Sequence, residues 1–485
     1  MSLTGALQNA VSGLVANGRQ LSVTSDNIAN ALTPGFATRR TVLTTRPDAI
    51  GGGVNVSSVE RATDPALSAL RRAADASAAE ANVYARGMER IASSVGELGD
   101  PDGLFERQVA FEESLAALAD NPESEPRQQN AVSDAMALAS KLNELDTSAR
   151  AVRESADADI ARIVGRINQA TEDIAALNRE IQRAESLGRD TTALQDRREL
   201  LIDEVSAALP VKVTYTERRG VELYTEQGLL LVGSTARLLE FAHTPVIGPE
   251  MIYDAGGGAL SGLNLNGLDI APGSGSAQAI ESGALAGAFR LRDEAGPELQ
   301  QRIDGFAEDL VDRLAAPGID PTTGPGDPGL FTDNGSAATD PVAPGIAGRI
   351  EVNAAVTPET GAAWRLRDGL GSGAPGSAGD DTILRSLLAG LREPSTASGN
   401  GVAANMRERA AFIAEAGTTE RFEASEIASF EQTRRETLAD QEAQVRAVDT
   451  DRELQQLITI EQAYAANAQV IQAAARMLDE LGRIG

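Results

Sequence analysis

Apolar residues at the beginning of the chain recur at alternating intervals of four and three positions. The pattern consists of Leu3, Leu7, Ala10, Leu14, Leu21 and Ile28, with Asn17 and Thr24 at the two positions that complete it. This alternation is typical of the contact face of a helix in a coiled coil. Three glycines weaken this helix by about 1 kcal/mol each relative to alanine. We therefore expect the segment to need a partner helix.

The other end of the chain carries a matching pattern, again with spacings of three and four. Its members are Leu457, Ile460, Tyr464, Asn467, Ile471, Ala474, Leu478 and Leu481. Thr450 and Glu453 have the spacing of a capping box, which predicts that this helix begins at Thr450. Amphipathic helices usually face the core of their own domain. Here the similarity of two patterns at opposite ends of the chain favours pairing of the two helices.

Each of these two patterns contains one asparagine near its middle, Asn17 in the first and Asn467 in the second. In an antiparallel pair the two residues lie at comparable depths and could meet, or lie one layer apart. A buried asparagine can fix the register of such a pair, because a shifted pairing leaves its amide unsatisfied. The alternative is that drift of the helical period turns either amide toward solvent or a channel.

The middle of the chain predicts a helical hairpin over 160–205. Its first helix carries the stripe Ile160, Ile163, Ile167, Ala170, Ile174, Leu177, Ile181 and Ala184, and breaks at Gly188. A second helix is expected from about Thr191, with Leu194, Leu201 and Val205 on its apolar face. Residues 104–150 also have a helical pattern, interrupted by a polar turn with two prolines at 120–126.

Residues after Pro210 are rich in β-branched side chains and predict a hairpin or small sheet, with a β-rich region over about 210–280. Gly- and Pro-rich stretches follow, and Trp364 is expected to anchor a small strand-rich unit. The expected fold is mainly α with β-rich insertions, with the terminal helices paired as a coiled coil. We expect three domains: a terminal one (1–55 with 431–485), a helical one (56–316 with 381–430) and a small β-rich or irregular outer one (317–380).

Composition excludes more functions than it indicates. The 43 Lys plus Arg against 71 Asp plus Glu give a net charge of −28, which disfavours nucleic acid and anionic membranes as partners. The chain has no cysteine and a single histidine, His243, read as a surface loop residue. No thiolate zinc site, cysteine nucleophile or His-rich metal site is therefore expected. The N-terminal residues lack the basic start and continuous apolar stretch of a secretory signal, so export is expected by a route without a cleavable signal.

Two candidate binding motifs have weak support. Gly371, Gly373 and Gly376 fit the dinucleotide pattern G-x-G-x-x-G, but no aliphatic strand precedes them and Pro375 lies in the turn, so a flexible linker is favoured. The acidic clusters at 99–103 and 319–329 lack EF-hand spacing and are interpreted as solvated turns. We expect no cofactor, no metal and no catalytic site, and hence no enzyme activity.

The segment from Leu21 to Arg39 resembles the motif shared by flagellar rod, hook and hook-associated proteins. The family pattern is Asn-Ile-Ala-Asn, then Thr-x-Gly and an aromatic residue. The matching residues here are Asn27, Ile28, Ala29, Asn30, Thr33, Pro34, Gly35 and Phe36, with Phe36 in place of the commoner tyrosine. Asn30 can end the helix, and Pro34-Gly35 forces a turn. The segment 457–481 resembles the C-terminal helix of the same family.

The middle of the chain separates the members of this family. Residues 163–213 resemble the central helical hairpin of the hook-associated protein 1 family, whereas rod and hook proteins have β-rich middles. The resemblance implies a secreted structural subunit of the bacterial flagellum that joins hook to filament. It also implies export by the flagellar type III pathway, self-association in a ring, and hook protein, hook-associated protein 3 and a cytoplasmic export chaperone as partners.

The resemblance implies an assembly interface at both chain ends. Its expected residues are Leu3, Leu7, Leu14, Asn17, Leu21, Asn27, Ile28, Asn30, Pro34, Gly35, Phe36, Leu457, Ile460, Tyr464, Asn467, Ile471, Leu478 and Leu481. Two alternatives stay open. One is another flagellar axial protein, a hook or rod subunit, and the other is a secreted enzyme or adhesin whose outer domain binds carbohydrate or calcium.

Overall fold

The computed structural model describes residues 3–46, 52–216, 219–339, 341–396 and 403–484. The described residues form two compact units built from interleaved segments. Unit 1 contains 1–77, 166–238 and 431–485, and unit 2 contains 78–165 and 239–430. The long helices α2 (Pro65–Val95), α4 (Glu125–Ser186) and α10 (Met406–Arg446) contribute residues to both units. The structure confirms the expected class, mainly α with β-rich insertions.

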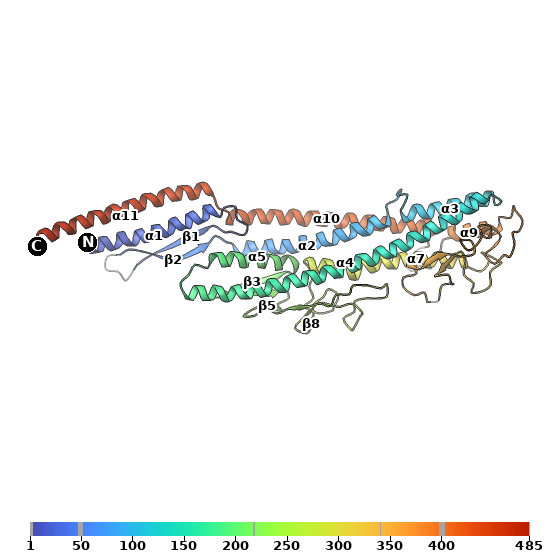
Figure 1. Cartoon of the computed structure of the whole chain (residues 1–485), viewed down its shortest axis with the longest axis horizontal. Coiled ribbons are helices and arrows are strands. Elements are labelled where there is room, and N and C mark those ends of the chain that lie inside the picture. Colours follow the sequence, from blue (N-terminus) through green and yellow to red (C-terminus); the bar gives the residue numbers. More distant parts are fainter. Residues whose placement is uncertain (1–2, 47–51, 217–218, 340, 397–402, 485) are drawn as a thin grey trace. The chain divides into compact units, whose positions relative to one another are not determined.

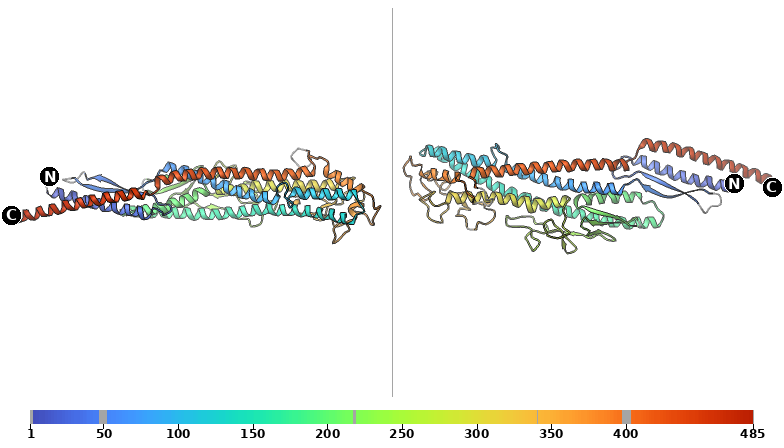
Figure 2. Two further views of the ribbon diagram at one scale, coloured as in Figure 1. Left: turned by 90° about the horizontal axis from the view of Figure 1, so that it is seen from above. Right: turned by 180° about the vertical axis from the view of Figure 1, so that it is seen from behind.

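The two ends of the chain form a helical pair in unit 1. Helix α1 (Leu3–Ala29) packs along α11 (Thr450–Ile484), and the two run antiparallel, with both chain ends at the same end of the pair (Figures 1 and 2). A hairpin of β1 (Arg39–Thr45) and β2 (Val54–Arg61) packs against α1. Its register pairs Arg39 with Arg61 and shifts between Val42 and Leu43. The predicted pairing of the terminal segments is confirmed.

The rest of unit 1 is built around the predicted helical hairpin. The end of α4 and α5 (Thr192–Ala208) pack with the antiparallel sheet β3 (Val211–Tyr215), β4 (Val221–Thr225) and β5 (Leu230–Val232). The part of the predicted stripe that lies in unit 1 consists of six residues of α4: Ile167, Ala170, Ile174, Leu177, Ile181 and Ala184. All are buried except Ala184, which is half-buried. Large aliphatic side chains at helical spacing thus located this core correctly.

Unit 2 has one continuous hydrophobic core. It is formed by α3 (Leu104–Asp120), α7 (Gly296–Ala315), α8 (Arg365–Asp368) and α9 (Thr382–Arg392) together with parts of α2, α4 and α10. Helix α6 (Ala284–Arg290) precedes α7. The small sheets of unit 2 are β6 (Leu239–Glu240), β7 (Asn264–Leu265) and β8 (Leu268–Asp269), and β9 (Phe331–Asp333) with β10 (Ile350–Val352). A short 3₁₀ turn, η2 (Ile346–Gly348), precedes β10.

The segment 317–380 shares this core. Phe331 is fully buried and its ring meets Phe111 edge to face, with 5.6 Å between centroids. The contacts therefore group 317–380 with unit 2 and group 166–238 with the terminal segments. The three-part division expected from the sequence differs from this grouping, because a segment poor in core residues of its own can still bury the few it has against a neighbouring helix. That division stays a prediction.

A buried charge cluster lies where α6 and α7 are joined by a single π-helical turn, η1 (Leu291–Ala295). Arg292 and Asp157 are both fully buried, and Arg292 Nη1 lies 2.7 Å from Asp157 Oδ1. Arg292 also pairs with Asp293 and donates to the carbonyl of Ser261. The second Asp157 oxygen accepts from the backbone N–H of Thr244. The cluster thus ties the long insertion between β5 and α6 to helix α4.

Two expectations about single residues need correction. Helix α11 begins at Thr450, but the residue that caps it is Asp449, whose carboxylate accepts from the N–H of Arg452 at 3.1 Å. An aspartate caps as well as a threonine, so the capping box was placed one residue late. His243 does lie exposed in a loop, yet its Nδ1 contacts the buried Asp157 at 2.8 Å.

Candidate assembly interface

Several small residues of α1 are buried where α11 and the β1–β2 hairpin pack against this helix. Gly5, Ala10 and Ala16 are buried, and Gly13 faces Asn467 so closely that a Cβ at position 13 would lie 2.7 Å from the amide nitrogen of Asn467. The stripe predicted from the sequence also includes Ala10 and Thr24, and both are buried. Its larger members Leu3, Leu7, Leu14, Leu21 and Ile28 are half-buried. Glycine and alanine let two helix backbones approach closely, and the leucines then lie at the sides of the contact.

On α11 the predicted stripe is divided between the contact and the surface. Ile460 and Ala474 are buried, whereas Leu457, Asn467 and Ile471 are half-buried. Tyr464 and Leu478 are 48% and 49% exposed. The side chain of Leu481 lies outside the described part of the structure.

The two asparagines behave as the register hypothesis allows, without testing it. Asn467 packs against Gly13, one helical turn before Asn17. Asn17 is half-buried, and its side-chain nitrogen is enclosed without a hydrogen-bond partner among the described residues. The role of both residues in fixing the register stays a prediction.

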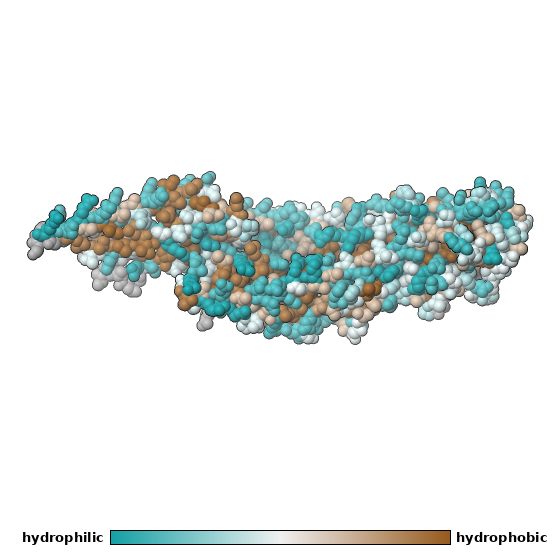
Figure 3. Space-filling model, viewed as in Figure 1, coloured by the Kyte–Doolittle hydropathy of each residue, from teal (hydrophilic) through white to brown (hydrophobic). Residues whose placement is uncertain are grey.

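Several large apolar side chains of the terminal pair face outward. Val11 and Val15 on α1 are 47% and 67% exposed, and Leu454 and Ile458 on α11 are about as exposed. Figure 3 shows extensive apolar surface over these two helices. Apolar surface of this kind on a solvent-facing helix marks a surface that another chain covers.

The motif after α1 forms a compact turn. Asn30 ends the helix and its side chain donates to the carbonyl of Asp26, while the hydroxyl of Thr33 donates to the side-chain oxygen of Asn30. Pro34 is exposed, and Gly35 has a φ of +79°, which a residue with a Cβ adopts only under strain. Phe36 is half-buried beneath the guanidinium of Arg39. The turn therefore redirects the chain as the sequence predicted.

This turn is joined to the connection between α10 and α11. The Thr38 N–H donates to the carbonyl of Arg446, and its hydroxyl donates to the carbonyl of Ala447 at 2.7 Å. Arg446 in turn donates to the carbonyl of Gly35 at 2.9 Å. A Cβ at Gly35 would also lie within 2.8 Å of three side-chain atoms of Leu200 on α5. The motif thus fixes the terminal pair to the helical hairpin.

Asn27 holds the turn to the first strand. It is almost fully buried, its amide donates to the carbonyl of Arg39, and its side-chain oxygen accepts from the Arg39 N–H, both at 2.9 Å.

We expect Asn27→Leu to destabilise the β1–β2 hairpin by about 1–3 kcal/mol, because two buried backbone groups of Arg39 lose their partner. Amide hydrogen exchange at residues 39–45 should become faster. The control is Asn30→Ala, which loses a local hydrogen bond of a less buried side chain. Equal exchange in the two variants would contradict this assignment.

A network of charged side chains joins α2, α5 and α10 within unit 1. Arg72 pairs with Glu199 and with Asp203, each at 2.6 Å. Arg71 pairs with Asp203 and, on α10, with Glu442. Burial opposes ionisation of Glu199, but Arg72 outweighs it and holds the pKa of Glu199 below its usual value. Burial likewise opposes ionisation of Glu442, yet Ser68 and Arg71 lower its pKa.

The sequence did not indicate this network. Helix α5 buries Asp196, Arg198 and Glu199, whereas Leu194 and Leu201 of its predicted apolar face are half-buried. The feature that could have revealed it is the helical spacing of the acidic residues Asp196, Glu199 and Asp203. The adjacent arginines Arg71 and Arg72 offered the complementary charges.

The described residues contain neither a candidate membrane span nor a candidate metal-binding cluster. No helix there is long and apolar enough to cross a membrane. No group of three or more His, Asp or Glu side chains in the same ranges could hold a metal ion.

Three protein-family models match the chain. A model for the helical domain of flagellar hook-associated protein FlgK matches residues 88–316. A flagellar basal body rod protein model matches residues 7–36. A model for the C-terminal part of the FlgEFG basal body rod proteins matches residues 446–484. The two terminal matches cover most of α1 and all of α11.

Named relatives are flagellar hook-associated protein 1 from several bacteria. The Bacillus subtilis protein is 25% identical over 98% of this chain and 97% of its own length. The Escherichia coli protein is 26% identical, over 49% of this chain and 45% of its own length. Among solved structures, the flagellar hook junction protein FlgK from Burkholderia pseudomallei has 22% identity and a TM-score of 0.43, covering 54% of this chain and 46% of that chain.

Proposed function

This chain belongs to the family of flagellar hook-associated protein 1, and we propose that it serves as a structural subunit that joins the flagellar hook to the filament. The observation that carries the proposal is the order of the matched segments along the chain. Rod-type segments at 7–36 and 446–484 enclose a hook-associated helical domain at 88–316. Location at the hook-filament junction, outside the cell, follows from this function.

The paired ends support assembly as the work of the molecule. Helices α1 and α11 pack along each other, with Gly13 close to Asn467, and leave Val11, Val15 and Ile458 exposed. A hook or rod subunit would share these ends, but the match at 88–316 is to the hook-associated protein. No catalytic role is proposed.

The partners are proposed on the same basis. Hook protein contacts the subunit on one side and hook-associated protein 3 on the other, and copies of the chain form a ring. Export through the flagellar type III pathway, with a cytoplasmic chaperone, fits terminal helices that depend on one another for stability. The interface residues expected from the sequence belong to this proposal.

Deletion of the gene tests the function directly. We expect cells to keep their hooks, to lose their filaments and to release unpolymerised flagellin into the medium, because the filament cannot attach to the hook. Electron microscopy of the cells and immunoblots of the medium measure both effects, and expression of the intact chain in trans is the control. Cells that retain filaments on normal hooks would contradict the proposal.

A further inference from the structure

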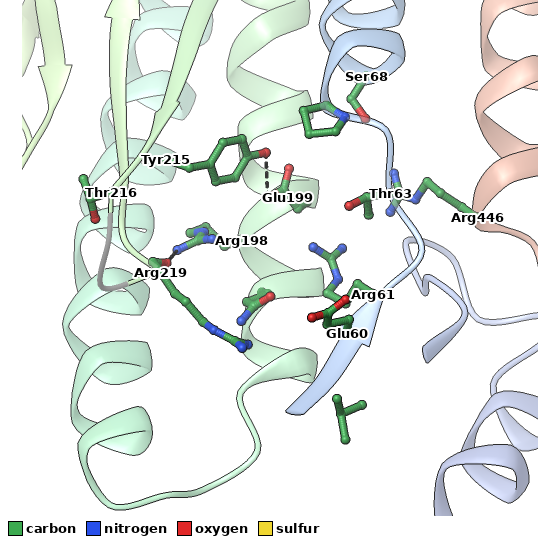
Figure 4. Close-up of a pocket in the computed structure, with 13 residues that line it drawn as sticks. Glu60, Arg61, Thr63, Ser68, Arg198, Glu199, Tyr215, Thr216, Arg219 and Arg446 are labelled. Atoms are coloured by element: carbon green, nitrogen blue, oxygen red, sulfur yellow. Dashed lines mark hydrogen bonds between the residues drawn. The ribbon is translucent and has the colours of Figure 1, made fainter. Parts of the chain in front are cut away.

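Unit 1 contains an open cavity of about 380 Å³ whose described lining residues include four arginines. Figure 4 shows Arg198, Arg219 and Tyr215 on one side of it, and Arg61 and Thr63 on the other. Arg446, at the end of α10, is the fourth arginine that the described residues contribute to the wall. The carboxylates that they contribute are those of Glu60 and Glu199.

Arg198 is the unusual member of this wall. It is only 2% exposed, and its Nη1 donates to two neutral acceptors, the side-chain oxygen of Asn178 at 3.0 Å and the carbonyl of Arg219 at 2.8 Å. Its Nε is enclosed without a partner, and no carboxylate of the described residues forms an ion pair with it. Burial lowers the pKa of Arg198, despite the nearby charge of Glu199. A buried cation without a bound anion is costly.

The acidic groups around the cavity are already engaged. Glu199 pairs with Arg72 at 2.6 Å, and Arg61 pairs with Asp196 at 2.7 Å. Arg446 lies 3.4 Å from Glu442. Glu60 lies exposed at the rim, where it accepts from the hydroxyl of Ser58. Arg219 pairs with Glu185 at 3.1 Å. Among the described lining residues, Arg198 is therefore the one arginine without an ion pair, and its Nε has no hydrogen-bond partner there.

We propose that this cavity binds a small oxyanion, of the carboxylate or phosphate class, against Arg198. A planar guanidinium matches such anions through paired hydrogen bonds, and a partly enclosed site strengthens them. Arg61 and Arg219, each paired with a carboxylate, flank the site. The anion is either free in solution or a carboxylate of a neighbouring copy, since the chain carries 71 acidic residues. The second source rests on the proposed assembly, whereas binding itself does not.

Calorimetric titration of the full chain with sodium phosphate and with sodium succinate, at constant ionic strength set by chloride, tests the site. We expect at least one of the two anions to bind, with affinity reduced about tenfold or more in Arg198→Met, since each charge-assisted hydrogen bond contributes about that factor. Because Arg198→Met removes a buried group, Arg219→Met provides a second variant at the more exposed wall. The matched control is Arg349→Met. Arg349 pairs with Asp333 in unit 2, away from the cavity residues, so this variant should bind the anions like the natural chain.

An assembly assay in cells distinguishes the two possible sources of the anion. If Arg219→Met weakens anion binding and also prevents junction formation in cells, the natural occupant is a carboxylate of a neighbouring copy. If binding weakens but junctions form normally, the occupant is a free anion. No binding of either anion, or equal binding by the natural chain and both cavity variants, would overturn the proposal while leaving the structural role in the flagellum untouched.

Discussion

Replacement of Gly13 by leucine is expected to abolish swimming and junction assembly while leaving the monomer folded. A Cβ at this position would lie 2.7 Å from the amide nitrogen of Asn467 and 3.1 Å from its Cγ, so the larger side chain must displace the Asn467 side chain or separate α1 from α11. Overpacking of a close contact costs about 1–3 kcal/mol. That cost falls on a pair of helices that hold each other in place. Motility assays and electron microscopy of hooks measure the result.

Gly18 provides the matched control for this experiment. It lies on the same helix, and a Cβ there would meet nothing within 4 Å. Gly18→Leu gains the same helix propensity, about 0.8 kcal/mol, without the steric conflict. Adding Asn467→Ala to Gly13→Leu should restore part of the assembly, because it removes the atoms in conflict. Equal motility of Gly13→Leu and Gly18→Leu strains would show that close packing at position 13 is unimportant.

Replacement of Arg292 by methionine is expected to produce the largest loss of stability in unit 2. The change leaves the fully buried Asp157 without its 2.7 Å partner and leaves Asp293 without its guanidinium. Removing one member of a buried ion pair costs about 3–5 kcal/mol. Amide exchange in α7, which follows η1, should become much faster. Exchange at 167–181, in unit 1, supplies an internal reference in the same sample.

The control for this second experiment is again Arg349→Met. Arg349 pairs with Asp333 at 2.8 Å, but its side chain is 35% exposed, so the expected loss is below about 1 kcal/mol. The thermal unfolding midpoint of the full chain should therefore fall clearly for Arg292→Met and little for Arg349→Met. Similar midpoints for the two variants would mean that the buried cluster contributes no more than a surface pair.

The sequence located the parts of the fold whose cores use large aliphatic side chains. The stripe from Ile167 to Ile181 gave the helical hairpin, because bulky residues at helical spacing leave a clear period. On α1 the same reasoning included Ala10 and Thr24, which are buried, but missed the buried Gly5 and Ala16. These small residues carry too little hydrophobicity to stand out beside the half-buried leucines.

The spacing of apolar residues could not predict the charged network and cavity of unit 1. Arg198 and Glu199 lie on the buried face of α5, where a pattern of hydrophobic and polar residues predicts exposure. Their burial depends on Arg72 and Asn178, which are distant in sequence. These groups come together only in the folded chain, so the pattern of residues along the sequence could not predict the cavity.

Unit 1 is built from segments at both ends of the chain, so it can finish folding only after the C-terminal segment has been synthesised. The hydrogen bonds between Thr38 and Arg446 join residues 408 positions apart, and closing a flexible loop of that length costs about 5 kcal/mol beyond a constant term. A chain synthesised from its N-terminus cannot complete this unit until residues 431–485 have been made. Unit 2, whose segments end at Phe430, has no such dependence. During synthesis α1 therefore has no α11 to pack against, and for that interval the region around residues 3–29 is open to proteases and to binding by other proteins.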